Sequence, residues 1–404
     1  MNNPFFDKPI LNSPYHKPDR HWELDESGQP TQQIIDLRRP ARFITPIPKP
    51  KKIKAFPQQE GLIFNEGLNL SSKAQQYDPT SVINNVRRQV DDWRKLNPDQ
   101  WRVTPETARL LLYWREHDFN GVRPFFCQIE AVETLIWLTE VAPHSQTGKQ
   151  LIEQLSTSSR EANPDLIRTA LKLATGAGKT TVMAMIIAWQ TLNAVRHPNS
   201  KLYTRGFLIC APGLTIRDRL RVLQPNDPDS YYRERELVPK DSLDDMGRAK
   251  IVITNYHAFK LRERIELSKG GRQLLQGRTG TEPKTLETEG QMLQRVMPDL
   301  MTMKHILAIN DEAHHCYRTK PSDPGEEKLT GDEKKEADKN NEAARLWISG
   351  LEIVQRKLGL LRVVDLSATP FFLSGSGYVE GTLFPWTISD FSLMDAIECG
   401  IVKL

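Results

Sequence analysis

The sequence has few cysteines and no long apolar run, and both absences narrow the classes of protein to consider. Its 404 residues include four cysteines, Cys127, Cys210, Cys316 and Cys399. They are too widely spaced to predict a disulfide framework or a cysteine metal site, so we expect reduced thiols in a cytoplasmic protein. The longest apolar run, residues 182–189, is too short to span a bilayer, and we expect no membrane partner.

The chain also lacks a strong excess of charge of either sign. Its formal net charge is +4, which is compatible with a nucleic-acid partner but does not establish one. The first residues show no basic start followed by an apolar stretch, so we expect no signal peptide. A hydrophobic content of 38% is sufficient for at least one sizeable core.

Proline is concentrated at the start of the chain. Residues 1–57 hold ten of the 27 prolines and show little hydrophobic periodicity. Residues 46–57, PIPKPKKIKAFP, are typical of an extended basic arm. Two interpretations stay open: a flexible or draped segment, or an arm that contacts phosphates. We assign residues 1–79 to a Pro-rich, largely irregular extension.

Helical patterns begin near residue 80. We expect helices over residues 78–96, 104–119 and 123–142, in a helical region that covers residues 80–160. Asp78, Thr80 and Ser81 are possible caps of the first helix. Thr104 before Pro105 has the pattern of an N-cap, which fixes the start of the second helix.

Beyond residue 161 the pattern is that of an α/β domain, which we expect to extend to residue 404. Short β-rich runs alternate with helical or loop material, as in a parallel sheet with helical crossovers. The predicted strands cover residues 168–174, 206–211, 249–255, 305–310 and 362–368. A polar insertion covers residues 267–291, and the charged residues 321–341 are expected to form a surface loop. Residues 394–398 predict a helix capped by Gly400.

A glycine-rich stretch, ATGAGKTT, lies between the first predicted strand of this domain and the next helix. Glycines allow backbone N–H groups to turn onto phosphate oxygens, and the helix adds its positive dipole end. Lys179 would neutralise the β- and γ-phosphates of a nucleotide, and Thr180 would offer its hydroxyl to Mg²⁺. The predicted ATP-binding (Walker A) loop comprises Thr175, Gly176, Ala177, Gly178, Lys179, Thr180 and Thr181. The full pattern places glycine where this chain has Leu173, so a glycine-containing turn with a surface lysine is the alternative.

A second acidic motif, NDEAHH, directly follows an apolar strand. Asp311 would hold Mg²⁺ through water, and Glu312 would orient or deprotonate the attacking water. The adjacent histidines match no common zinc spacing. A third motif, SATP, ends the last predicted strand with Ser367, Ala368 and Thr369, although small hydroxyl residues often simply close a strand.

Three further stretches carry candidates of lower specificity. In RPFFCQ, Gln128 could hydrogen-bond an adenine edge, or it could be an ordinary helix-surface residue. In CAPGLTI, Gly213 and Thr215 could open a helix that meets a nucleic-acid phosphate, with Arg217, Arg219 and Arg221 nearby. A solvated basic helix face is the alternative. In ITNYH, Thr254, Asn255 and His257 are similar candidates.

Taken in order, RPFFCQ, ATGAGKTT, CAPGLTI, ITNYH, NDEAHH and SATP resemble the first-domain motifs of superfamily 2 DEAD/DEAH-type motors. The doubled histidine and the closing AIECGIVK are most similar to the restriction (Res) subunits of type III restriction–modification enzymes. The resemblance covers roughly residues 100–404 and implies a RecA-like P-loop domain with flanking helices.

The resemblance also implies roles for single residues and partners. Gln128 would contact adenine, Lys179 and Thr180 would bind phosphate and Mg²⁺, and Asp311 and Glu312 would serve hydrolysis of ATP. His314, Ser367, Ala368 and Thr369 would couple nucleotide state to DNA. The implied partners are double-stranded DNA and a modification methyltransferase subunit. A catalytically idle nucleotide- or DNA-binding fragment and an RNA helicase module are the alternatives.

Such enzymes also carry a second RecA-like domain, whose arginines reach the γ-phosphate, and a nuclease domain. We expect both to be missing from these 404 residues, because the chain closes on the opening of a new element. The nearest mimic of a nuclease motif pairs Pro298 and Asp299 with residues 326–328. We reject it because its second half lies in the charged loop rather than on a strand.

Overall fold

The computed structural model describes residues 4–25, 27–42, 79–213, 216–264, 285–320 and 330–403. The predicted basic arm at residues 46–57, Asp78, Thr215, most of the polar insertion and residues 321–329 lie outside the described residues. Part of the rejected nuclease mimic, residues 326–328, lies there as well.

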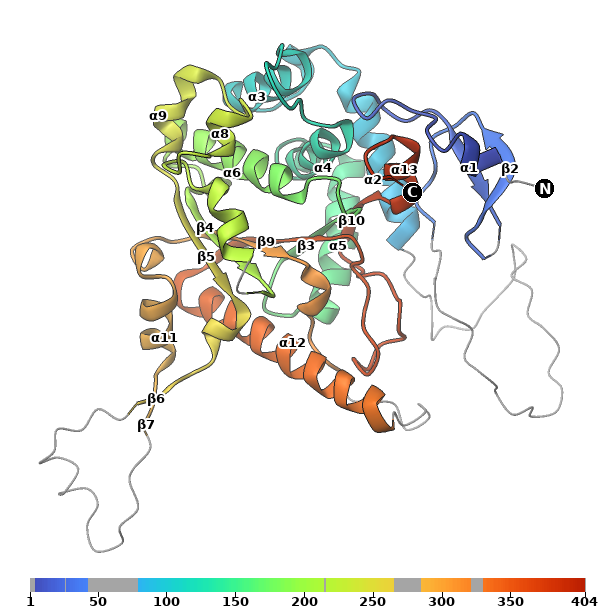
Figure 1. The fold of residues 1–404 in the computed structure, drawn as a ribbon. Helices are drawn as coiled ribbons and strands as arrows, with labels where there is room; N and C mark the ends of the chain where they lie inside the picture. Colours follow the sequence, from blue (N-terminus) through green and yellow to red (C-terminus); the bar gives the residue numbers. More distant parts are fainter. Residues whose placement is uncertain are drawn as a thin grey trace, which may run out of the picture.

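A six-stranded parallel sheet forms the centre of the domain (Figure 1). Its order is β10-β3-β9-β8-β4-β5. The five predicted strands of this sheet are confirmed, and the sixth, β10, was not predicted. The strands are β3 (Arg168–Leu173), β4 (Gly206–Ala211), β5 (Lys250–Asn255), β8 (Ile306–Asp311), β9 (Leu360–Ser367) and β10 (Thr387–Phe391).

Helices cover both faces of this sheet, which explains why a central strand such as β4 is a continuous buried run. Along β4, Phe207 and Ile209 join the core on one face, whereas Leu208 and Cys210 join the core on the other. The first face carries α2 (Pro79–Arg94), α3 (Pro105–Glu116), α4 (Phe126–Ile136) and α6 (Lys179–Arg196), and the second carries α11 (Glu289–Val296) and α12 (Gly331–Leu358).

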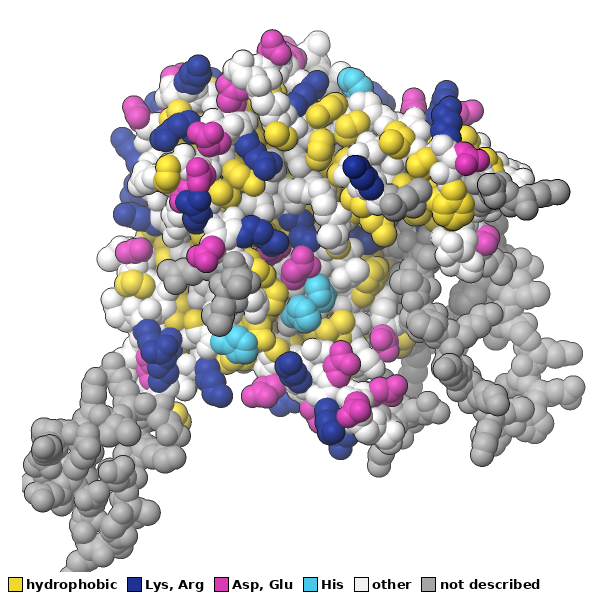
Figure 2. Space-filling model, viewed as in Figure 1, with side chains coloured by type: hydrophobic (Ala, Val, Ile, Leu, Met, Phe, Trp, Pro, Cys, Tyr) yellow, Lys and Arg dark blue, Asp and Glu magenta, His cyan; other side chains and the backbone are white. Residues whose placement is uncertain are grey.

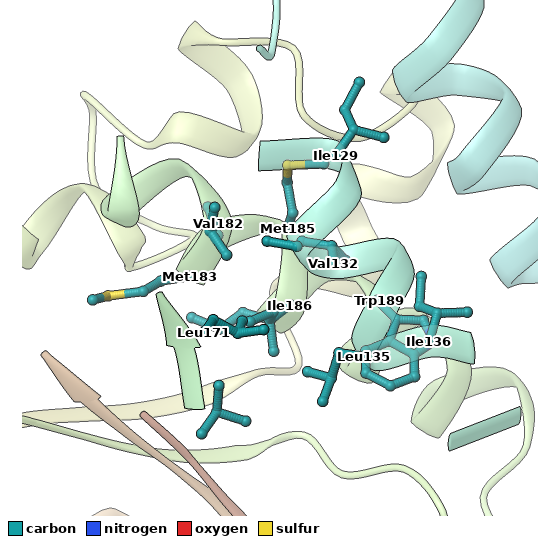
Figure 3. Packing of buried hydrophobic residues seen from close by; sticks show 14 of the residues in the cluster. Ile129, Val132, Leu135, Ile136, Leu171, Val182, Met183, Met185, Ile186 and Trp189 are labelled. Atoms are coloured by element: carbon teal, nitrogen blue, oxygen red, sulfur yellow. The ribbon is translucent and has the colours of Figure 1, made fainter. Parts of the chain in front are cut away.

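The helix that follows the glycine-rich loop is buried on all sides. Every residue of α6 from Thr181 to Asn193 is buried, between the sheet and the surrounding helices. Figure 3 shows Val182, Met185 and Ile186 of this helix packed near α4 and β3. Each large apolar side chain buried here contributes about 1.5–3 kcal/mol, so the core holds the start of α6 firmly against the sheet.

The predicted helices are confirmed with shifted ends. Thr104 caps α3 by accepting a hydrogen bond from the N–H of Thr107, with Pro105 in the first turn. The helix predicted over 123–142 begins only at Phe126 and continues beyond α4 as a π-helical turn, Trp137–Val141. Then follow α5 (Gln146–Ala162), the short helices α7 (Ile216–Leu220), α8 (Tyr231–Glu234) and α9 (Leu243–Met246), and α13 (Leu393–Glu398).

The charged stretch at residues 321–341 was wrongly predicted to be a loop throughout. Its second half belongs to α12, a helix of 28 residues. The buried residues Ala337, Asn341, Ala344, Trp347 and Ile348 recur at helical spacing, and the first part has few apolar residues because it extends past the core. A two-stranded sheet of β6 (Glu263–Arg264) and β7 (Thr285–Leu286) flanks the polar insertion.

The described part of the N-terminal extension packs on the domain instead of lying free of it. It forms α1 (Pro4–Asp7) and an antiparallel pair of β1 (His21–Leu24) and β2 (Pro30–Ile35). Phe5 and Trp22 form a small core with Ile397 of α13. The prolines suppress helical periodicity without preventing packing, which is why the sequence pattern left a flexible and a draped segment both open, and the described part is draped on the domain.

Candidate nucleotide-binding site

The loop between β3 and α6 has the geometry of an anion cradle. Gly176 and Gly178 adopt left-handed backbone conformations, with φ of +86° and +82°, and Gly178 is the N-cap of α6. Within the described residues, the N–H groups of Gly178, Lys179 and Thr180 have no hydrogen-bond acceptor. These free donors and the positive end of the α6 dipole point to the binding of phosphate.

The acidic motif lies beside this loop because β8 and β3 both pair with β9 and end at the same edge of the sheet. Lys179 Nζ lies 2.7 Å from Glu312 Oε1. Glu312 has a φ of +50°, a left-handed conformation that a side chain rarely adopts. This turn places its carboxylate, which is partly exposed, next to the phosphate loop.

Asp311 is almost completely buried at the end of β8. Burial raises the pKa of its carboxyl and the neighbouring Glu312 adds to this, whereas Lys179 and Arg219 oppose it. Arg219 Nη2 lies 3.2 Å from Asp311 Oδ2. A divalent cation at this carboxylate would favour its ionised form further.

His314 connects the acidic motif with the third motif. Its Nδ1 lies 3.0 Å from the hydroxyl oxygen of Ser367, which also accepts a hydrogen bond from the N–H of Thr369. Burial, assisted by His315, lowers the pKa of His314 to about 4, so the ring is neutral at physiological pH. Figure 2 shows histidine side chains gathered near the middle of one face of the molecule. The structure brings the predicted coupling residues together, and their role stays a prediction.

Gln128 is buried beneath the phosphate loop rather than lying on a helix surface. Its side-chain amide donates to the carbonyl oxygen of Ala177 at 2.8 Å and accepts from the N–H of Phe125 at 3.0 Å. A Cβ atom at Gly178 would lie only 2.2 Å from Gln128 Nε2. The close approach of Gln128 therefore requires glycine at position 178. Its predicted contact with adenine stays a prediction.

The nucleic-acid candidates lie along the same edge of the sheet. Gly213 follows β4 and Asn255 ends β5, and these two strands are paired in parallel as far as Ala211 and Asn255. Asn255 Oδ1 is buried without a hydrogen-bond partner among the described residues. The side chain of Arg217 lies outside the described part, and the Thr254 hydroxyl donates a hydrogen bond to the carbonyl oxygen of Asn255 at 3.4 Å.

Sequence reasoning missed two arginine contacts in this region. Arg219 was considered a phosphate contact, yet it pairs with Asp311. Arg235 was not considered; it donates a hydrogen bond to the Thr181 hydroxyl at 3.0 Å and stacks on Tyr231. Arg221 pairs with the partly buried Asp227 and with the exposed Asp229, so two carboxylates engage its guanidinium. No local pattern marks Arg235, because its contact depends on how α8 packs against α6.

The donors present fit a nucleotide with its Mg²⁺ ion. The loop supplies free N–H groups and the cation of Lys179, while the Thr180 hydroxyl and the Asp311 carboxylate are oxygen ligands of the kind that Mg²⁺ prefers. Among the described residues, no group of three or more His, Cys, Asp or Glu side chains could hold a metal by itself. Mg²⁺ commonly binds through one or two protein ligands together with substrate phosphates.

Comparison with known proteins agrees with this geometry. A family model described as type III restriction enzyme, res subunit, matches residues 122–372, more than half of the chain. The chain therefore belongs to this family and contains a superfamily 2 helicase-like domain of the ATPase motor type. Proteins of this kind generally use ATP and Mg²⁺.

Two other comparisons add little. The crystal structure of T4 UvsW aligns with 11% identity and a TM-score of 0.27, and the alignment covers 79% of this chain and 43% of that chain. A TM-score this low does not establish a shared fold. The alignment also shows that this chain spans less than half the length of T4 UvsW. No curated protein matches the sequence. In the part of the chain that the structure describes, no helix is long and apolar enough to cross a membrane.

Proposed function

We propose that this chain is the ATP-binding motor module of a DNA-dependent translocase, in a type III restriction endonuclease. The observation that carries the proposal is the contact between Lys179 and Glu312, since it places the free N–H groups of the loop beside the acidic motif. Family membership supports the same assignment. The proposed setting is the cytoplasm, with double-stranded DNA and a modification methyltransferase subunit as partners.

The proposed reaction is the attack of water on the γ-phosphate of ATP, which would be assisted by Mg²⁺; the bond from the γ-phosphorus to the bridging oxygen breaks, and ADP and phosphate are released. Lys179 leaves Glu312 and turns to the phosphates when nucleotide enters, because a polyphosphate attracts the ammonium group more strongly than one carboxylate does. Glu312 is then free to orient the attacking water and to accept its proton. Thr180 and Asp311 would hold the Mg²⁺ ion, which would offset the negative charge of the phosphates, and Arg219 is the side chain that now neutralises the Asp311 carboxylate.

We propose that turnover in this chain alone is slow and weakly stimulated by DNA. The described residues form one RecA-like sheet, and the family resemblance implies that arginines of a second such domain complete the site. An arginine of this kind accelerates phosphoryl transfer by about 10³–10⁵. A catalytically idle nucleotide-binding module is the second candidate. It is supported by the pairing of both carboxylates of the acidic motif with basic side chains, Glu312 with Lys179 and Asp311 with Arg219.

Hydrolysis of ATP with and without duplex DNA tests the proposal, for the unaltered chain, Lys179→Ala and Lys149→Ala. Lys149 is an exposed cation of α5 and serves as the matched control. We expect slow hydrolysis in the unaltered chain and the control, and a loss of at least about 100-fold in Lys179→Ala. Equal hydrolysis in all three would overturn the proposal. Hydrolysis below detection in all three would instead favour the idle module.

A further inference from the structure

A hollow of about 500 Å³ lies at the edge of the sheet opposite the nucleotide loop. The sheet is parallel, so β4, β5 and β8 all begin at this edge, whereas the loop and the acidic motif follow strand ends. The hollow is lined by residues from the segment after α6, the segment before β5 and the segment before β8: Ala194, Val195, residues 197–201, residues 203–205, Arg248 and residues 303–305.

The charge of this lining has one sign. Lys201, Arg205, Arg248 and Lys304 line the hollow and are exposed, and no aspartate or glutamate lines it. In the part of the chain that the structure describes, none of these four side chains has an ion pair or a hydrogen bond. Elsewhere the charges are mixed: on the face shown in Figure 2, basic and acidic side chains are interleaved over α8 and α9.

Three of these cations form a row that follows the strands. Arg205 immediately precedes β4, Arg248 lies two residues before β5, and Lys304 lies two residues before β8. The strands are neighbours in the order β8-β4-β5, and adjacent strands lie about 4.8 Å apart, so the row spans about 10 Å. Cations that converge on one point suit a single small anion, whereas a row suits a chain of phosphates.

We propose that this cation row, Arg205, Arg248 and Lys304, binds the sugar–phosphate backbone of nucleic acid without regard to sequence. Exposed and unpaired Lys and Arg side chains are the groups that make such contacts, since they release counterions from the nucleic acid. This contact lies at the opposite edge of the sheet from the nucleic-acid candidates that follow β4 and β5. A nucleic acid that contacts both sets of residues would therefore pass both edges of the sheet. The inference takes nucleic acid as the partner class from the proposed function.

The test replaces the row by Arg205→Gln, Arg248→Gln and Lys304→Gln together. The matched control replaces three exposed cations of α5 and α12, Lys149→Gln, Lys334→Gln and Lys339→Gln, so that both triple variants lose the same charge. Binding to a random-sequence 30-base-pair duplex is followed by fluorescence anisotropy over a range of KCl concentrations. Each phosphate contact contributes about 0.9 to the magnitude of the slope of log K against log salt. We therefore expect this magnitude to fall by about 2 to 3 in the row variant and to stay unchanged in the control.

A cross-linking experiment locates the contact directly. The four native cysteines are buried, so Asn199→Cys introduces an exposed thiol at the hollow and Thr157→Cys introduces one on α5. After attachment of a photoreactive group, we expect the duplex to cross-link to the label at position 199 at least about five times more strongly than to the label on α5. This difference should vanish in the row variant, because the cations that hold the backbone there are gone.

Equal salt slopes for the two triple variants, or equal cross-linking at both labels, would overturn the inference. A second result would also overturn the inference: the row variant no longer binds poly-glutamate, but its binding to DNA keeps the salt dependence of the unaltered chain. That result would favour an acidic protein partner. ATP hydrolysis by the row variant is measured in parallel. If the row variant hydrolyses ATP at the unaltered rate but binds DNA with a smaller salt dependence, this inference is tested separately from the proposed function. The proposed function depends on Lys179, at the other edge of the sheet.

Discussion

Single side chains at the site are held in conformations and ionisation states that the local sequence does not reveal. Glu312 occupies a left-handed conformation, which costs a non-glycine residue about 1–2 kcal/mol. The same turn brings its carboxylate to Lys179 and lets His314 reach Ser367. The motif pattern predicted residues that the structure brings close together, and their membership of a nucleotide site stays a prediction. The contact between Lys179 and Glu312 follows from the turn and could not be read from the spacing of the motifs.

The buried His314 makes stability depend on pH in a defined direction. The pKa of His314 is about 4 in the folded chain and about 6.5 when unfolded, so the unfolded state takes up the proton first as pH falls. The free energy of unfolding therefore decreases below pH 6.5, and His314 accounts for about 2 kcal/mol of the decrease between pH 7.5 and 5. Urea unfolding of the unaltered chain and of His314→Gln measures this.

Between pH 7.5 and 5, the free energy of unfolding of His314→Gln should decrease by about 2 kcal/mol less than that of the unaltered chain. His144→Gln is the control, because it removes an exposed histidine and leaves the contact between His314 and Ser367 in place. An identical pH dependence in the unaltered chain and His314→Gln would show that this histidine is not held neutral by burial.

At the scale of elements, the N-terminal extension holds the helix that closes the described chain. The N–H groups of Leu11 and Asn12 donate to the carbonyl oxygen of Glu398 on α13. The N–H of Trp22 donates to Glu398 Oε1, and Arg39 Nη2 lies 2.5 Å from the same oxygen. This arrangement joins residues far apart in sequence, and composition alone could not decide between a flexible and a draped segment.

Removal of Arg39 should loosen this attachment. Burial raises the pKa of Glu398 to about 7, with Arg39 opposing the rise, so the carboxylate is ionised at pH 8.5. We expect Arg39→Met to lower the free energy of unfolding by about 3 kcal/mol at that pH, because a buried charge loses its cation. Urea unfolding measures the loss, and Glu398→Gln in the same background should recover part of it. If Glu398→Gln restores none of the lost free energy of unfolding, the ion pair between Arg39 and Glu398 is not the cause of the loss.

The sequence allowed five of the six strands of the central sheet to be predicted, because each contains a short run of β-branched or other apolar residues, even where, as in the edge strand β5, most side chains are only partly buried. It did not allow β10 to be predicted, since that strand has five residues, two of them only partly buried, and gains its place by pairing with β3. The first half of α12 was missed for a related reason. Its polar turns extend past the core, so they show charge rather than periodicity.

For the whole molecule, the candidate nucleotide site and the proposed cation row lie at opposite edges of the sheet. The carboxyl edge carries the phosphate loop, the acidic motif and the candidate contacts after β4 and β5. The amino edge carries the cation row beside the hollow. Parallel strands make this separation automatic, because everything that follows a strand lies on one side and everything that precedes it lies on the other. The order of motifs predicted the first edge, whereas the second depends on strand order and carries no motif.

The most direct test of the central claim is calorimetric titration of the chain with ATP in the presence of Mg²⁺. The account predicts binding with a dissociation constant in the range of about 1–100 μM, at least about tenfold weaker in Lys179→Ala and unchanged in Lys149→Ala. It also predicts that removal of Mg²⁺ weakens binding to the unaltered chain. Binding of equal strength in the unaltered chain and Lys179→Ala, or no binding to the folded chain, would contradict the assignment of this loop to ATP.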